Sequence, residues 1–190
     1  MLQFLCLGVH VPQTPAPKAR HYVAQRVSAG KSRVRWSAPE GRHVSHTYTR
    51  CHFHVVFSTK ERRKLISKEV QPTLWSYITG ICHNQKMMPV AVGGMDDHAH
   101  LLFHLPPTMA LSKAVLLMKA NSSKWMNEHG SRFAWQKGFG AFSVSESALD
   151  SVANYIRTQE KHHTKMSFEE EFLALLRKHN VEYDPKYVFG

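Results

Sequence analysis

The stretch Gly93-Gly94-Met95-Asp96-Asp97-His98-Ala99-His100-Leu101-Leu102-Phe103-His104 joins a turn to a run that is typical of a buried β-strand. Its two glycines and two aspartates favour a tight turn between two strands. Successive side chains of a strand point to opposite faces, so His98 and His100 share one face while Ala99 and Leu101 point into a core. The stretch therefore predicts a β-hairpin that carries a pair of imidazoles on one side.

A His-x-His pair alone is a weak signal, because with 14 histidines in 190 residues such a pair is expected by chance. The chain has a second pair, His52-Phe53-His54, inside residues 48–57. Apolar and polar residues alternate there, which predicts a half-buried strand. Spacing does not separate the two pairs.

The rest of the chain alternates helical and strand patterns around the hairpin. We expect strands at 48–57, 89–95, 98–105 and within 133–144, and helices at about 67–84, 111–129, 147–162 and 168–180. Ser67 and Thr108 are the expected N-caps of the first two helices, and capping-box patterns open the last two, at Ser147 and at Ser167. This order predicts an α+β fold, a ferredoxin-like antiparallel sheet with helices packed on it.

The composition indicates one domain with an appendage, because 190 residues at 43% hydrophobic can bury one sizeable core. A net charge of +11 favours an anionic partner, either nucleic acid or a membrane surface. No apolar run approaches the roughly 20 residues of a spanning helix, and no secretory signal is present. We therefore expect a cytoplasmic protein. Three cysteines without a C-x-x-C pair indicate neither a zinc knuckle nor a disulfide framework.

Residues 1–47 differ from the rest, since prolines interrupt them and no amphipathic pattern persists. We expect them to be disordered. They carry +6 of the net charge, which leaves +5 for residues 48–190. The segment is either a basic arm that binds nucleic acid or upstream sequence translated from a misplaced start. The predicted domain is 48–190.

Two sets of basic side chains could contact a phosphate backbone. They lie in a loop after the first strand and on the helix 111–129, and they are Lys60, Arg62, Arg63 and Lys64, and Lys119 and Lys124. A solvated surface is the other interpretation of each set, and both stay open.

If His98 and His100 bind a divalent ion, two neutral imidazoles leave its charge uncompensated. Such an ion suits the polarisation of an anionic phosphodiester. The amide of Gln159 could add a neutral oxygen ligand. Mg²⁺ or Mn²⁺ fits this set, with imidazole favouring Mn²⁺, and the lack of a nearby cysteine argues against structural zinc.

Tyr155 stands one turn before Gln159 on the predicted helix 147–162, so the two side chains are neighbours. A phenol with an ordinary pKa of about 10 needs activation by a metal or a base before it can attack phosphorus. The resulting phosphotyrosine keeps the bond energy for rejoining. This favours cleavage with strand transfer; a metal-dependent hydrolase is an alternative that leaves Tyr155 unexplained.

Four stretches together resemble the HUH-type single-tyrosine transposases of bacterial insertion sequences, including those associated with repetitive extragenic palindromes. The stretches are 48–65, 97–102, 135–143 and 155–159, the last followed by His162-His163. The resemblance covers all but the first 47 residues and implies the HUH endonuclease fold in a bacterial, nucleoid-associated protein.

The resemblance also implies roles for single residues. His98 and His100 become the metal ligands, Gln159 the third ligand and Tyr155 the nucleophile. His54 keeps a structural or site-supporting role, and His162-His163 is expected to be at the surface or to face DNA.

Such enzymes cut single-stranded DNA beside imperfect hairpins and leave a 5′-phosphotyrosine and a free 3′-OH. They work as homodimers whose composite sites combine the histidines of one subunit with the tyrosine of the other. A domesticated protein that binds hairpin DNA with little or no catalysis is the alternative.

Overall fold

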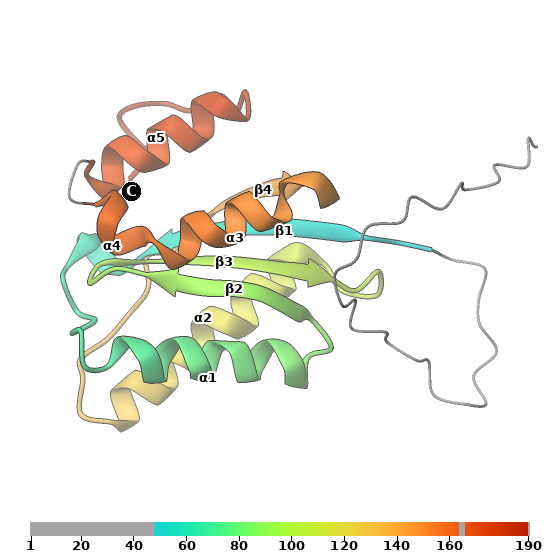
Figure 1. Cartoon of the computed structure of the whole chain (residues 1–190). Coiled ribbons are helices and arrows are strands. Elements are labelled where there is room, and N and C mark those ends of the chain that lie inside the picture. Colours follow the sequence, from blue (N-terminus) through green and yellow to red (C-terminus); the bar gives the residue numbers. More distant parts are fainter. Residues whose placement is uncertain (1–47, 164–165, 190) are drawn as a thin grey trace, which may run out of the picture. The chain divides into compact units, whose positions relative to one another are not determined.

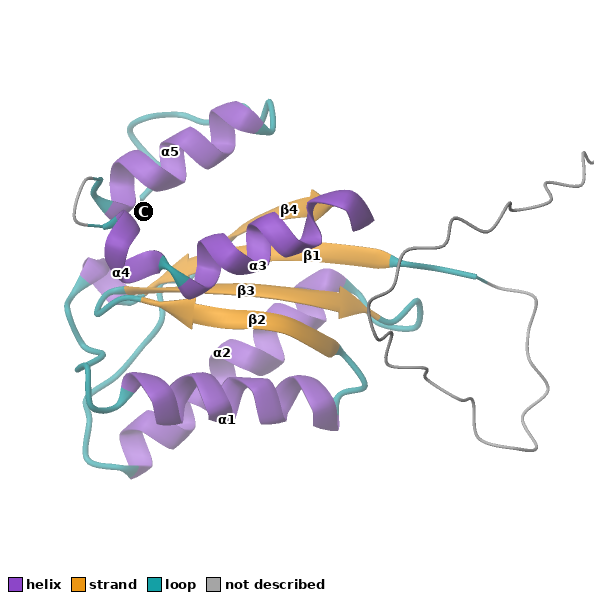
Figure 2. Ribbon diagram, viewed as in Figure 1, coloured by secondary structure: helices purple, strands orange, loops and turns teal. Residues whose placement is uncertain are grey.

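The structure is a computed structural model that describes residues 48–163 and 166–189. The expectations for residues 1–47 lie outside the described residues. The strands are β1 (Cys51–Ser58), β2 (Met88–Gly94), β3 (His98–Leu105) and β4 (Gly140–Val144) (Figure 2). The helices are α1 (Gln71–Asn84), α2 (Leu111–Glu128), α3 (Leu149–Arg157), α4 (Gln159–His162) and α5 (Phe168–Lys178). None of the described helices is long and apolar enough to cross a membrane.

The four strands form one antiparallel sheet in the spatial order β2-β3-β1-β4. Strand β1 is central and pairs with β3 on one side and with β4 on the other. Along the chain, a helix follows β1 and another follows the β2–β3 hairpin. Together the two orders give the predicted ferredoxin-like sheet, which is confirmed.

Helices cover both faces of the sheet, with α1 and α2 on one side and α3 on the other (Figure 1). Ala99, Leu101 and Phe103 of β3 are buried in the main core together with residues of α1 and α2. Leu102 faces the other way and packs against Ile156 of α3. The predicted alternation along β3 is therefore confirmed, and the same alternation places His98 and His100 on the α3 side.

The expected N-caps of the first two helices are wrong. α1 begins at Gln71 with Pro72 in its first turn, where proline needs no N–H partner. Ser67 lies in a preceding turn, and its carbonyl accepts the backbone N–H of Val70. α2 is capped by Ala110 without a side-chain hydrogen bond, so Thr108 does not cap it.

The single helix expected at 147–162 is also wrong, because α3 ends at Arg157 and α4 begins at Gln159. Thr158 between them has φ −106° and ψ 20°, and its hydroxyl donates to the Asn154 carbonyl at 2.8 Å. A threonine hydroxyl that binds a carbonyl one turn back commonly bends a helix. α3 has no side-chain cap, whereas the capping box at Ser167 is confirmed.

The turn that leads into β3 requires a glycine at position 94. Gly94 has φ +152°, and a Cβ there would lie 2.2 Å from the carbonyl oxygen of His98. We expect Gly94→Ala to lower the free energy of unfolding by about 2 kcal/mol or more, because backbone strain and steric overlap act together. Urea unfolding measures this change.

Gly80→Ala is the matched control, because a Cβ at this position in α1 meets nothing within 4 Å. It should leave stability unchanged or raise it by up to about 1 kcal/mol through helix propensity. If Gly94→Ala were as stable as the wild type, position 94 would not require a glycine.

Candidate active site

His98 and His100 of β3 lie at the bottom of the candidate site, and both are fully buried. His100 sits opposite Gly93 in the hairpin. A Cβ on Gly93 would lie 2.9 Å from the carbonyl oxygen of Ile156, so this glycine allows α3 to approach the sheet closely. The approach brings the ring of Tyr155 to 5.9 Å from the ring of His100, centroid to centroid.

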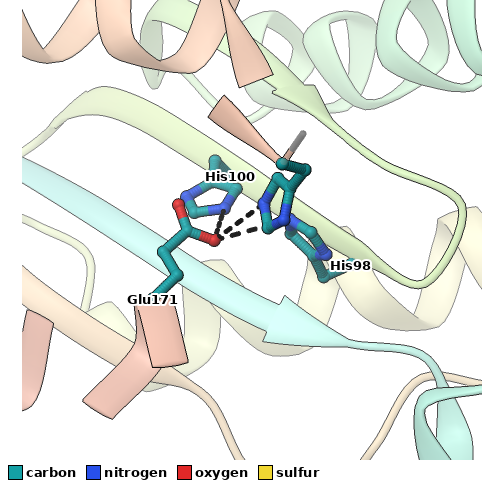
Figure 3. A group of neighbouring side chains, drawn as sticks. His98, His100 and Glu171 are labelled. Carbon is teal, nitrogen blue, oxygen red and sulfur yellow. Dashed lines mark ion pairs between the residues drawn. The ribbon is translucent and has the colours of Figure 1, made fainter. Parts of the chain in front are cut away.

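Glu171 of α5 directs its carboxylate at the imidazoles (Figure 3). Its Oε2 atom lies 3.4 Å from His100 Nε2, 3.8 Å from His98 Nε2 and 3.0 Å from His163 Nε2. The side chain of Glu171 is 2% exposed. One buried carboxylate oxygen therefore faces three imidazole nitrogens.

The second oxygen of the same carboxylate binds the residues predicted as nucleophile and third ligand. Oε1 of Glu171 accepts a hydrogen bond from the Tyr155 hydroxyl and another, at 3.1 Å, from the Gln159 amide. Glu171 thus joins the tyrosine to the histidines through one side chain.

The donor atoms lie close enough together to form a candidate cation site. The ligand atoms of four side chains, His98, His100, His163 and Glu171, all lie within 4.8 Å of one another. Two ligands that each lie about 2.1 Å from a shared ion are roughly 3.0 to 3.4 Å apart. No other such group of His, Cys, Asp or Glu occurs among the side chains that the structure describes.

Several atoms of the site are buried without a hydrogen-bond partner among the described residues. They are His98 Nε2, His100 Nε2, Gln159 Oε1 and Glu171 Oε2. Buried polar atoms are rarely left unpaired, and here the four converge. The donor set therefore fits a divalent cation.

A second layer of contacts orients the two histidines. His98 Nδ1 lies 2.5 Å from an oxygen of Asp97, and His100 Nδ1 lies 3.0 Å from Nε2 of His54. A carboxylate oxygen accepts a hydrogen bond, so this contact favours the hydrogen of His98 on Nδ1, which leaves the lone pair of Nε2 toward the centre. Partners of this kind fix the ring orientation of metal-binding histidines.

Burial sets the charge states of the site. It lowers the pKa of His100 to about 4, so this imidazole is neutral near pH 7. Burial raises the pKa of Glu171, but the imidazoles of His100 and His163 that face it outweigh burial and hold this pKa below its ordinary value. Burial and then the hydrogen bond to Glu171 raise the pKa of Tyr155, so its hydroxyl is protonated and needs activation.

Comparison with known proteins identifies the family. The sequence model of the family described as "Transposase IS200 like" matches residues 47–159, more than half of the chain. This chain belongs to the IS200-like transposase family. Relatives described as the transposase for insertion sequence element IS200, from Salmonella typhimurium LT2 and Salmonella typhi, are each 25% identical over 124 residues. Each alignment covers 61% of this chain and 81% of the relative.

A solved structure shows the same fold. A crystal structure of a candidate transposase from Deinococcus radiodurans R1 matches 63% of this chain and 98% of its own length, with a TM-score of 0.50 and 22% identity. A REP-associated tyrosine transposase bound to a REP hairpin matches 65% of this chain and 74% of its own, with a TM-score of 0.48 and 16% identity. The predicted fold, that of the HUH endonucleases, is confirmed.

The structure brings the predicted site residues of the IS200-like transposase together within one chain. His98, His100, Tyr155 and Gln159 all lie around Glu171. Tyr155 and Gln159 do so from two helices instead of one, because of the break at Thr158. The composite site between two subunits stays a prediction.

Sequence reasoning missed Glu171 and misplaced His163. His163, expected at the surface or facing DNA, lies in the cluster with its side chain 9% exposed, so that expectation is wrong. Glu171 falls between Phe168 and Leu175 on the apolar side of α5, at helical spacing. An acidic residue within an apolar stripe was the available signal.

Two of the basic side chains predicted to contact DNA are bound within the fold. Arg62 pairs with Glu169 at 2.8 Å and donates to the carbonyl of Phe189. Lys119 donates to the carbonyls of residues 136–138, and burial lowers its pKa to about 8. Both stabilise the loops that they contact.

The other basic candidates lie at the surface. Lys60 is exposed, and three further cations form ion pairs: Arg63 with Glu61, Lys64 with Asp96 and Lys124 with Glu128. Exposed pairs of this kind contribute less than about 1 kcal/mol, so a phosphate can replace the acidic partner. Contact of these residues with DNA stays a prediction.

Proposed function

We propose that this IS200-like transposase cleaves and rejoins single-stranded DNA through a 5′-phosphotyrosine on Tyr155. The contacts of Glu171 carry the proposal: one carboxylate lies between the Tyr155 hydroxyl and the Nε2 atoms of His98 and His100. An anion therefore fits between nucleophile and imidazoles. A phosphodiester oxygen has the same charge and the same capacity to accept hydrogen bonds.

A divalent cation, Mg²⁺ or Mn²⁺, fits the nitrogen and oxygen donors of the site. His98, His100 and Gln159 would hold it, with Glu171 as an added carboxylate ligand. Bound there, the ion would supply positive charge that favours the tyrosinate and polarises the phosphodiester.

The residues of the chain then have defined tasks. Tyr155 supplies the attacking oxygen, and its proton passes to Oε1 of Glu171, which already accepts the hydroxyl hydrogen bond. The bond from phosphorus to the 3′ oxygen breaks as the bond to the tyrosine oxygen forms. The leaving oxygen takes up the proton held by Glu171, directly or through water, and becomes a free 3′-OH, so Glu171 is again a carboxylate. A later attack by a 3′-OH on the phosphotyrosine rejoins a strand and restores Tyr155.

The substrate in this proposal is single-stranded DNA next to a hairpin, as the sequence resemblance implies. A homodimer in the cytoplasm, associated with the nucleoid, belongs to the same proposal. The net charge of +5 on residues 48–190 is compatible with an anionic polymer as partner.

The test uses the full chain with hairpin oligonucleotides taken from the DNA that flanks its own gene. We expect wild-type protein to form an adduct that survives a denaturing gel when Mn²⁺ or Mg²⁺ is present, and none with EDTA. His100→Ala should lower the yield by roughly 100-fold or more, since it removes a ligand of the ion.

Two other outcomes would favour a different function. Tight hairpin binding without an adduct under any metal condition would favour the domesticated DNA-binding protein. Cleavage that is metal-dependent but never yields an adduct would favour a hydrolase.

A further inference from the structure

His54 of β1 is a buried imidazole that the proposed chemistry does not use. Its side chain is 3% exposed. In the pairing of β1 with β3, His54 lies opposite Leu102, so His100 is its diagonal neighbour on the same face. Its Nε2 atom lies 3.0 Å from Nδ1 of His100.

The two rings meet edge to edge. Their centroids are 5.2 Å apart and their planes differ by 25°. With facing nitrogens 3.0 Å apart, this is the alignment of an N–H···N hydrogen bond, with the hydrogen near the planes of both rings.

The hydrogen bond can be formed in two ways. A neutral imidazole carries one N–H and one lone pair, so either ring can donate to the other across the 3.0 Å contact. If Nδ1 of His100 donates, its Nε2 keeps a lone pair toward the cluster. If His54 donates, the hydrogen of His100 must sit on Nε2, where it blocks metal binding.

We propose that His54 is a positioning residue that holds His100 with its hydrogen on Nδ1 and so aims the Nε2 lone pair at the metal. The inference rests on the proposed function and adds a residue to it. Asp97 has the same task for His98 but carries a negative charge. A neutral imidazole orients His100 without reducing the positive charge available to a phosphodiester.

The chain offers a matched control on the same strand and face. His52 is also buried, at 4% exposed, and its ring lies 5.4 Å from that of His104. Its Nδ1 atom is 3.9 Å from Glu146, which is outside the cluster. His52→Phe therefore tests the loss of a buried imidazole from β1 without the contact to His100.

The experiment measures the dissociation constant of Mn²⁺ from the full chain by electron paramagnetic resonance of the free ion. We expect His54→Phe to weaken binding by about 10- to 100-fold, the usual effect of losing a partner of a metal-binding histidine. His54→Gln can still accept from Nδ1 through its amide oxygen, so it should remain within about 3-fold of wild type, as should His52→Phe. Circular dichroism checks that each variant is folded.

Nitrogen-15 NMR of the wild type loaded with diamagnetic Mg²⁺ tests the same point without a variant. The ring of His100 should show its hydrogen on Nδ1. A hydrogen on Nε2 would overturn the inference even if His54→Phe did not fold.

The remaining results are also decisive. Unchanged Mn²⁺ affinity in folded His54→Phe, or an equal loss in His54→Gln, would overturn the positioning role and leave the proposed function in place. Absence of Mn²⁺ and Mg²⁺ binding by the wild type would overturn the proposed metal site and this inference with it.

Discussion

Tyr155→Phe is expected to abolish the covalent protein–DNA adduct while hairpin binding and Mn²⁺ binding persist. The substitution removes one oxygen and keeps the ring that lies beside His54 and His100. Without that oxygen no phosphotyrosine can form, so we expect cleavage to fall by roughly 10⁴-fold or more, as when other nucleophiles are removed. Denaturing gels measure the adduct, and fluorescence anisotropy measures hairpin binding.

Tyr77→Phe is the control for this change. Tyr77 lies on α1, where it is 36% exposed and stacks on Trp125, on the other side of the sheet from α3. Its loss should leave the adduct unchanged. Because Tyr155 donates to a buried carboxylate, Tyr155→Phe should also lower the free energy of unfolding by about 1 to 2 kcal/mol. Cleavage at the wild-type rate in Tyr155→Phe would instead assign the reaction to a hydrolase.

The parts of the site that sequence reasoning predicts are those that short-range patterns determine. The alternation in β3 sets the faces of His98 and His100, because the period of a strand is two residues. The glycines before it set the hairpin, and the element order sets the sheet. Tyr155 followed from its neighbour Gln159 and from the family resemblance.

Sequence reasoning missed the parts of the site that depend on specific contacts. A periodic pattern of apolar residues does not predict such contacts. Thr158 interrupts the helix that was expected to run through residue 162, because its hydroxyl competes for a backbone carbonyl. Glu171 reaches the histidines only because α5 folds back over the sheet (Figure 1). Arg62 resembles a surface cation until the C-terminal segment supplies Phe189 as its partner. Glu171 and Arg62 thus depend on contacts with residues distant in sequence, and the break at Thr158 depends on a side chain that competes for a backbone hydrogen bond.

Acid is expected to destabilise the metal-free protein steeply between about pH 6.5 and pH 4. Burial lowers the pKa of His100 to about 4, and burial followed by repulsion from His100 lowers that of His54 to about 3. The unfolded chain has ordinary histidines, with a pKa near 6.5. In this range the unfolded state therefore binds more protons than the folded state, so stability rises with pH and is lost as pH falls.

Two further groups act in opposite directions. The pKa of Glu171 lies below its ordinary value, so its stabilising contribution is also lost in acid, at pH below about 4.5. Burial lowers the pKa of His163, but its interactions with Glu171 outweigh burial and raise it overall. Its contribution is present below about pH 6.5 and is lost as pH rises, which opposes the other histidines. The two strongly lowered histidines outweigh it.

One pKa unit corresponds to about 1.4 kcal/mol, so each of these two histidines should lower the free energy of unfolding by about 3 kcal/mol over this range. Together they should lower it by about 5 to 6 kcal/mol, less the opposing contribution of His163. Urea unfolding in EDTA at several pH values measures the fall. His54→Phe removes one of the two responsible groups, so its stability should change with pH only about half as steeply as that of the wild type. Suppose instead that the stability of the wild type stays constant from pH 6.5 to 4.5. The pKa values of His54 and His100 would then be the same in the folded and the unfolded protein, and the site would not hold a buried, neutral pair of imidazoles.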